Sequence, residues 1–223
     1  MADVPVVYGA TYSVYVRAVR LTLWTKHVPY ELVEVDVFAP GGPPPRHLER
    51  HPFGRIPAFE HGVLKLYETA PICRYIDEAF AGAPLQPSTP ASRAVMGQAI
   101  SIMDNYAYRS MVWGVYVERV DKPQRGLAPD LARIAAARDQ TSVCLEALER
   151  LAPSADWLAG SELTLADLHA APMFALFMKT PDAQELTRRH ARLTAWWGRI
   201  SSYAARAGIM APAEIIEAQS GYP

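Results

Sequence analysis

The sequence predicts an α/β domain followed by an all-helical domain. In residues 1–80, short β-branched runs alternate with patterns of helical spacing. Residues 81–90 (AGAPLQPSTP) have the composition of a linker, and the periodic segments after them all have helical spacing. We therefore expect one domain over residues 1–80, a linker over 81–90 and a helical domain over 91–223.

The elements of the first domain are expected in the order β-α-β, then β-β-α. A β-rich run at residues 4–8 ends at Gly9, and residues 14–27 repeat apolar side chains at helical spacing. Residues 30–37 (YELVEVDV) alternate as a half-buried strand does, and the following APGGPPP is irregular. Two short runs flank His61-Gly62, a hairpin signal, and residues 70–80 are helical. This order is that of a thioredoxin-like α/β unit.

The second domain is expected to consist of helices. The pattern predicts helices at residues 91–120, 129–151, 165–179 and 182–202, with a short one near Glu214. In Thr164-Leu165-Ala166-Asp167 we identify a capping box variant, with the threonine capping the helix and the aspartate reaching back.

Composition indicates a soluble globular protein of a reducing compartment. Hydrophobic residues make up 50% and charged residues 20%, and the net charge of −1 argues against general binding to nucleic acid or anionic membranes. Cys73 and Cys144 lie in apolar helical contexts, which predicts neither a disulfide framework nor a metal cluster. The N-terminus enters a strand almost directly, and no apolar run reaches 18 residues. We expect no signal peptide, no membrane span and a cytoplasmic protein.

The most informative segment is His51-Pro52-Phe53-Gly54-Arg55-Ile56-Pro57, followed by Leu66-Tyr67-Glu68-Thr69. Pro57 heads a strand-like run, where its missing N–H is tolerated. We expect the Ile56-Pro57 bond to be cis, so that the backbone of Ile56 points toward an extended ligand. Glu68 and Thr69 precede an apolar helical run, and a helix N-terminus holds a carboxylate well. The two segments together predict a site for a small peptide with charged ends.

These segments resemble the glutathione site of the glutathione transferase family, whose pattern is N-P-x-G-x-V-P followed by E-S. Here His51 replaces asparagine, Ile56 replaces valine and Thr69 replaces serine. Trp157-Leu158-Ala159-Gly160, the capping box and Leu193-Thr194-Ala195-Trp196-Trp197 resemble the family's helical domain, so the likeness covers nearly the whole chain. It implies a glutathione transferase that uses glutathione as cosubstrate, needs no metal and forms a homodimer.

The resemblance also implies a catalytic residue in the turn after the first strand. Ser13 lies where serine-type members, phi or theta-like or bacterial, carry their catalytic serine, four residues before an arginine. Tyr8, at the end of the first strand, is the alternative from the tyrosine-type classes, and Tyr12 is a third. No cysteine occupies this turn, so chemistry through a mixed disulfide is not expected.

Four residues are implied to bind glutathione: Ile56, Glu68, Thr69 and Arg55. Glu68 and Thr69 would hold the γ-glutamyl end, and Arg55, where many serine-type members have glutamine, would hold the glycyl carboxylate. The family often places a histidine or lysine before this segment. This chain has Gly42 and Pro43 there, with Arg46 and His47 nearby, so either these two substitute or that end is held loosely.

The first helix of the second domain should supply the acceptor pocket. Its methionine and aromatic residues suit a tolerant apolar cavity, and we choose Tyr106, Met111 and Trp113. Asp104 lies where some members reach the neighbouring subunit's glutathione. The predicted substrate is a small apolar electrophile. The alternatives are a glutathione-dependent isomerase or dehalogenase, and a non-catalytic transferase-like module that binds ligands or partner proteins.

Overall fold

The computed structural model describes residues 3–151 and 156–209. Of these, residues 3–83 together with Ile209 form one compact unit, and residues 84–208 form a second. None of the helices within the described ranges is both long enough and apolar enough to cross a membrane.

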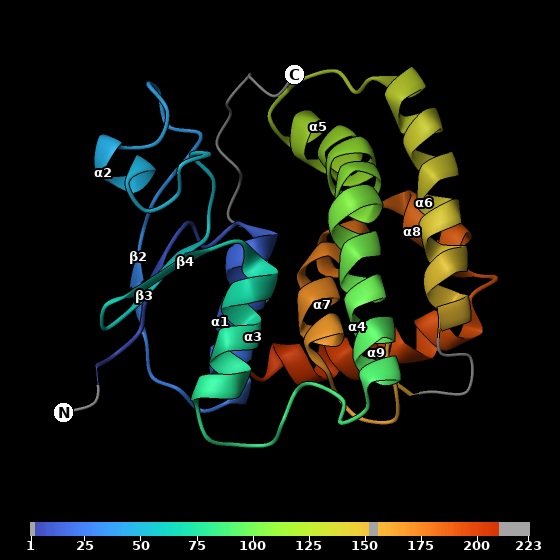
Figure 1. Cartoon of the computed structure of the whole chain (residues 1–223). Coiled ribbons are helices and arrows are strands. Elements are labelled where there is room, and N and C mark those ends of the chain that lie inside the picture. Colours follow the sequence, from blue (N-terminus) through green and yellow to red (C-terminus); the bar gives the residue numbers. More distant parts are fainter. Residues whose placement is uncertain (1–2, 152–155, 210–223) are drawn as a thin grey trace. The chain divides into compact units, whose positions relative to one another are not determined.

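The first unit is a four-stranded sheet with helices, as predicted (Figure 1). The strand order is β2-β1-β3-β4, with β1 parallel to β2 and antiparallel to β3, and β3 antiparallel to β4. The elements are β1 (Val6–Tyr8), α1 (Val14–Thr25), β2 (Glu31–Val33), α2 (Pro45–Leu48), β3 (Ala58–His61), β4 (Leu64–Tyr67) and α3 (Thr69–Ala79). The short helix α2 was not expected. The proline at its first position suits a helix start, and His47 within it is buried.

Helices α1 and α3 lie side by side on one face of the sheet (Figure 1). Val7 and Phe59, on neighbouring strands, are fully buried. Beyond the last turn of α1, the ammonium of Lys26 is buried against α3. It donates to the carboxylate of Asp77 at 3.1 Å and to the carbonyls of Gly82 and Ala83 at 3.4 and 3.1 Å. This buried charge is thus paired and hydrogen-bonded, as burial requires.

Within the described residues the elements of the second unit are all helices, as predicted, and one isolated bridge joins Trp157 to Gly160. Its elements are α4 (Pro90–Ile102), η1 (Met103–Asp121), α5 (Lys122–Gln124), α6 (Leu131–Leu151), α7 (Leu165–Phe177), α8 (Pro181–Thr187) and α9 (Ala191–Ala205). The long helix expected at 91–120 changes at Met103 into the π-helical η1. The single helix expected at 182–202 is wrong, because the backbone of His190, at φ −115° and ψ 74°, separates α8 from α9. The short helix expected near Glu214 lies outside the described residues.

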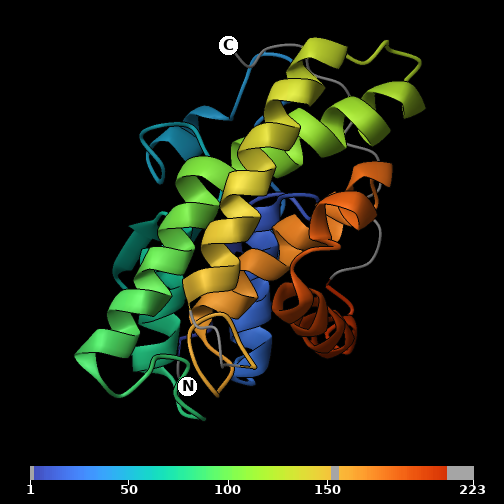
Figure 2. The same cartoon turned by 90° about the vertical axis from the view of Figure 1, so that its right-hand side faces the viewer.

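Close packing and a buried carboxylate both contribute to the core of the second unit. Helix α6 runs alongside η1 in both views (Figures 1 and 2), and a Cβ added to Gly114 would lie only 2.3 Å from Cβ of Ala137. The capping box is confirmed: buried Asp167 accepts from the Thr164 amide at 2.7 Å and from its hydroxyl at 2.8 Å. The same carboxylate accepts from the Trp196 indole of α9 at 2.8 Å, so it joins two helices.

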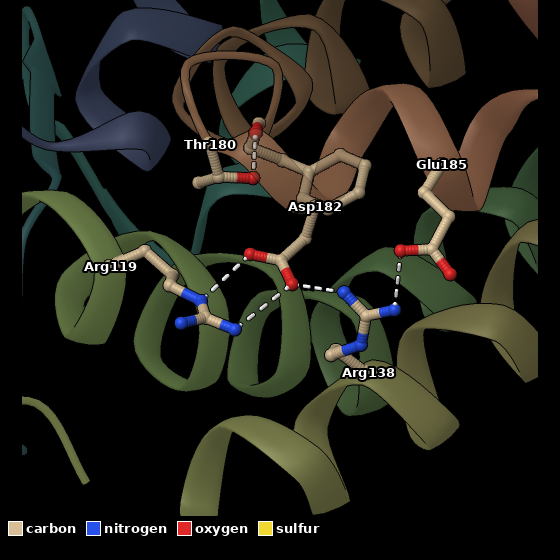
Figure 3. Close-up of polar contacts among 6 residues, drawn as sticks. Arg119, Arg138, Thr180, Asp182 and Glu185 are labelled. Carbon is tan, nitrogen blue, oxygen red and sulfur yellow. Dashed lines mark hydrogen bonds and ion pairs between the residues drawn. The ribbon is translucent and has the colours of Figure 1, made fainter. Parts of the chain in front are cut away.

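A cluster of charges joins η1, α6 and α8 (Figure 3). The carboxylate of Asp182, which is only 3% exposed, accepts from Arg119 at 2.9 Å and from Arg138, and Arg138 also reaches Glu185 at 2.8 Å. Burial opposes ionisation of Asp182, but the hydrogen bonds and charges of Arg138 and Arg119 outweigh it and lower its pKa. The cluster therefore acts as an ionic link between three helices.

Candidate functional site

The register of the sheet gathers the predicted site residues of the first unit at one end. Tyr8 pairs with Ala58, and Ala58 pairs with Tyr67. The loop before β3, the chain after β1 and the chain after β4 therefore share this end of the sheet. These segments carry Ile56, Ser13 and Glu68-Thr69. Helices α1 and α3 both begin here, so two helix N-termini with their partial positive charge meet at the site.

Ser13 is the N-cap of α1. Its backbone is extended, and its hydroxyl oxygen accepts from the Val16 amide at a long 3.4 Å. The hydroxyl is half-buried, and its proton is free to turn toward a ligand. The buried Arg17 fixes the turn, because its Nε donates to the Thr11 carbonyl at 2.8 Å. A rigid turn with an accessible hydroxyl at a helix N-terminus suits the stabilisation of an anion.

The loop before β3 presents free backbone groups. The Ile56-Pro57 bond is cis, as predicted. Among the described residues none bonds to the amide or the carbonyl of Ile56, which is half-buried. Ile56 also lies against Gly9, since a Cβ added to that glycine would come within 3.2 Å of its Cβ. The backbone of Ile56 is therefore available to a ligand, next to the turn that carries Ser13.

Glu68 has an unusual backbone at the start of α3. Its φ is 70° and its ψ is 129°, a region that side chains other than glycine rarely occupy and that costs about 1–3 kcal/mol. The side chain is exposed and makes no capping hydrogen bond. Thr69, which follows, is buried at the first position of the helix. Such strain is common where a side chain is held for binding.

The other predicted binding residues differ in their surroundings. Arg55 is exposed, and its guanidinium makes no hydrogen bond or ion pair with the described part of the chain. Arg46 is likewise exposed. His47, in contrast, is buried at 2% exposure, and its Nε2 lies 2.6 Å from the Arg55 carbonyl oxygen. His47 is therefore turned inward, and a free cation in this segment comes from Arg46 or Arg55.

His51 is the second buried histidine of this region. Its ring lies 5.0 Å from that of Tyr67, the residue before Glu68, and 6.2 Å from that of His47. Burial and, to a smaller extent, the neighbouring His47 and Arg55 together lower the pKa of His51 to about 4. The ring is thus neutral near pH 7, and it packs the loop before β3 onto the end of β4.

Tyr8 takes part in a separate polar cluster. Its hydroxyl donates to Oε2 of Glu60 at 2.7 Å, Arg50 donates to Oε1 of Glu60 at 3.1 Å, and the guanidinium of Arg50 lies 4.2 Å from the centre of the Tyr8 ring. The cluster borders a recess of about 300 Å³ that is lined by Tyr8, Val33, Glu34, Val35, Pro44, Arg46, His47 and Arg50. No motif predicted this cluster, because Tyr8 lies 52 positions from Glu60 and Arg50 lies 10 positions from it. Tyr12, the third candidate, donates to Asp36 at 2.7 Å.

In the second unit, the residues chosen for the acceptor pocket differ in exposure. Tyr106 is 55% exposed, Met111 is fully buried and Trp113 is half-buried with its ring against Tyr108. Their joint role as an acceptor pocket stays a prediction. The carboxylate of Asp104 accepts a hydrogen bond from Nε2 of His169 of α7 at 2.7 Å. In residues 3–151 and 156–209, no group of histidine, cysteine, aspartate and glutamate side chains has the arrangement of a metal site.

Comparison with known proteins covers both units. Residues 7–84 match the family described as "Glutathione S-transferase, N-terminal domain", and residues 102–203 match "Glutathione S-transferase, C-terminal domain". The Arabidopsis thaliana protein Glutathione S-transferase F11 is 31% identical over 198 residues, which are 88% of this chain and 92% of the relative. The rice protein (Oryza sativa subsp. japonica) Probable glutathione S-transferase GSTF1 is 31% identical over 212 residues, 92% of this chain and 96% of the relative.

Solved structures give the same result. Glutathione transferase F7 from Populus trichocarpa superposes with a TM-score of 0.77 at 29% identity, covering 92% of this chain and 99% of that one. Glutathione S-transferase I from mais, in complex with an atrazine glutathione conjugate, superposes with a TM-score of 0.78 at 26% identity, covering 94% of this chain and 99% of that one.

Proposed function

Because this chain belongs to the glutathione S-transferase family, we propose that it conjugates the thiolate of glutathione to small apolar electrophiles, with Ser13 as its catalytic residue. It is an enzyme, a glutathione S-transferase. The observation that carries the proposal is the meeting of Ser13, the free backbone of Ile56 and the strained Glu68 at one end of the sheet.

The activation step is the stabilisation of a thiolate. Lowering a thiol pKa by about two units takes about 2.7 kcal/mol. A hydrogen bond to a charged group contributes about 1.5–3 kcal/mol, and the N-terminus of α1 adds to it. A single hydroxyl donor from Ser13 is therefore sufficient in magnitude. The thiolate then attacks the electrophilic carbon, and the leaving group departs or the addition product is protonated.

Glutathione is proposed to bind along this end of the sheet. The amide and carbonyl of Ile56 pair with its cysteinyl backbone, as the free backbone groups allow. Glu68 accepts from the γ-glutamyl amine, and Thr69 donates its hydroxyl and amide to that carboxylate. The exposed Arg55 is assigned to the glycyl carboxylate.

The acceptor substrate is proposed to contact Tyr106, Met111 and Trp113 of η1. The mais enzyme was solved with a glutathione conjugate of atrazine, which supports a small apolar acceptor for this relative. We further propose that the enzyme is cytoplasmic. We also propose that it forms a two-fold homodimer, since most soluble oligomers are closed and symmetric. Light scattering at micromolar concentration should then give about twice the chain mass of 24.6 kDa.

The proposed function is tested with the purified chain. Calorimetry measures glutathione binding, and a panel of aryl halides, enones and epoxides measures conjugation in parallel. The proposal is supported if the protein turns over at least one electrophile and if this turnover is much slower in Ser13→Ala. Binding of glutathione without turnover of any electrophile would favour a non-catalytic binding module, and dehalogenation or isomerisation of a panel member would favour that alternative.

A further inference from the structure

The buried His47 contacts the peptide group on which the proposed ligand contact depends. The Nε2 of His47 lies 2.6 Å from the carbonyl oxygen of Arg55, a short distance for a hydrogen bond of this type. A carbonyl oxygen has no proton, so Nε2 must carry the proton and donate it. The direction of this hydrogen bond follows from the chemistry of the acceptor.

The hydrogen bond fixes the orientation of the next amide. The Arg55 carbonyl and the Ile56 N–H belong to one peptide group, and the only cis bond in the described chain is Ile56-Pro57, so this group is trans. In a planar trans peptide the C=O and the N–H point in opposite directions. When His47 holds the oxygen, the Ile56 N–H is turned away from the histidine. Within the described residues no protein group accepts from it.

Among the described residues, the side chain of His47 makes no hydrogen bond other than the one to the Arg55 carbonyl. The side chain is 2% exposed, and its Nδ1 is buried without a hydrogen-bond partner among the described residues. The segment that links it to Arg55 is itself folded: the His47 carbonyl accepts from the His51 amide at 2.8 Å, and the His51 carbonyl accepts from the Gly54 amide at 2.9 Å. The side chain of His47 thus closes a loop whose free end is the amide of Ile56.

We propose that His47 is a positioning residue for glutathione: through the Arg55 carbonyl it sets the direction of the Ile56 amide that pairs with the ligand backbone. This inference rests on the proposed function, since it assumes that glutathione pairs with Ile56. His47 does not touch the ligand. It also draws electron density from the peptide group, which makes the Ile56 N–H a better donor.

The test replaces the donor while keeping the volume. His47→Leu removes the N–H, and His47→Gln keeps an amide donor near the position of Nε2. Titration calorimetry with glutathione and with S-methylglutathione should show affinity about tenfold weaker in His47→Leu and largely restored in His47→Gln. The KM for glutathione should rise in parallel, with kcat at saturating glutathione changed less than twofold. The ¹⁵N and ¹H shifts of the Ile56 amide should move in His47→Leu and return in His47→Gln.

The control separates positioning from stability. Gly114→Ala, in the second unit, should lower the melting temperature and leave glutathione affinity unchanged, because a Cβ there meets Ala137. If the wild type binds glutathione and His47→Leu binds equally well, the inference is overturned and the proposed function stands. If the wild type fails to bind glutathione, both the inference and the proposed function are contradicted. If His47→Leu does not fold, His47→Gln decides: a folded variant with a tenfold loss of affinity and an Ile56 amide shift like the wild type overturns the inference.

Discussion

The hydroxyl of Tyr8 donates its proton to Oε2 of Glu60 at 2.7 Å. Burial, together with this hydrogen bond and the charge of Glu60, raises the pKa of Tyr8, although Arg50 opposes the shift. A phenol that donates its only proton to a carboxylate has no proton left to donate to a bound thiolate. The hydroxyl of Ser13, which accepts only a long hydrogen bond from Val16, keeps its proton for a ligand.

We therefore predict that Ser13→Ala raises the pKa of the bound glutathione thiol by at least one unit. The reason is the loss of one hydrogen bond to the thiolate, and one unit corresponds to about 1.36 kcal/mol. Ultraviolet difference spectra of the bound thiolate against pH measure this value. Tyr8→Phe is the matched control and should leave it nearly unchanged. The reverse pattern would assign the chain to the tyrosine type.

Glu68 should show a conflict between binding and stability. Glu68→Ala and Glu68→Gly both lose the carboxylate, and calorimetry should show glutathione binding weakened by about 1–3 kcal/mol in each. Glycine accepts the positive φ of 70° without strain, so Glu68→Gly should be about 1 kcal/mol more stable than Glu68→Ala in urea unfolding. Unchanged affinity in both variants would remove Glu68 from the site.

His51 should make the protein sensitive to mild acid. Its pKa in the folded state is about 4, below the ordinary value of 6.5, so the unfolded chain binds the extra proton first as the pH falls. The contribution of the neutral ring is complete above pH 6.5 and is lost progressively toward pH 4. Between pH 7 and pH 5 the free energy of unfolding should therefore fall by about 1–2 kcal/mol less in His51→Asn than in the wild type. Urea midpoints at both pH values measure this, with the exposed His27→Asn as the control; equal losses in all three proteins would contradict it.

The ionic link of the second unit should be important for its stability. Asp182→Ala leaves Arg119 and Arg138 without their shared carboxylate, and we expect unfolding free energy to fall by about 2–4 kcal/mol. Glu185→Gln removes only the exposed outer pair and should cost less than about 1 kcal/mol. Because the pKa of Asp182 is lowered in the folded state, its ionised carboxylate stabilises the protein above the usual pKa range of an aspartate. This stabilisation is lost as the pH falls below that range. Chemical denaturation at neutral and acid pH tests both statements; equal effects of the two variants would contradict the ranking.

The sequence predicted those features that are written in local patterns. The alternation of β-branched residues, the hairpin at His61-Gly62 and the capping box at Thr164 all correspond to observed elements. The four-residue α2 was missed because its helix depends on the burial of His47 and not on periodicity. The break at His190 was missed because apolar residues continue at helical spacing across it.

The candidate site was predictable in its residue types and not in its supporting contacts. Ser13, Ile56 and Glu68 follow from their motifs. The positive φ of Glu68 is a backbone property that no residue type in the motif predicts. The contact of Tyr8 with Glu60 joins residues 52 positions apart, and sequence spacing alone does not show which side chains meet across strands.

The buried Lys26 has a consequence for dissecting the chain into pieces. Its ammonium donates to four oxygens: the carboxylate and the carbonyl of Asp77, and the carbonyls of Gly82 and Ala83, which follow the end of α3 at Ala79. A fragment cut directly after the helix would keep the ammonium in the interior with only Asp77 to receive it. The shortest N-terminal fragment that folds independently should therefore reach Ala83, and the last few residues before the second unit belong to the architecture of the first.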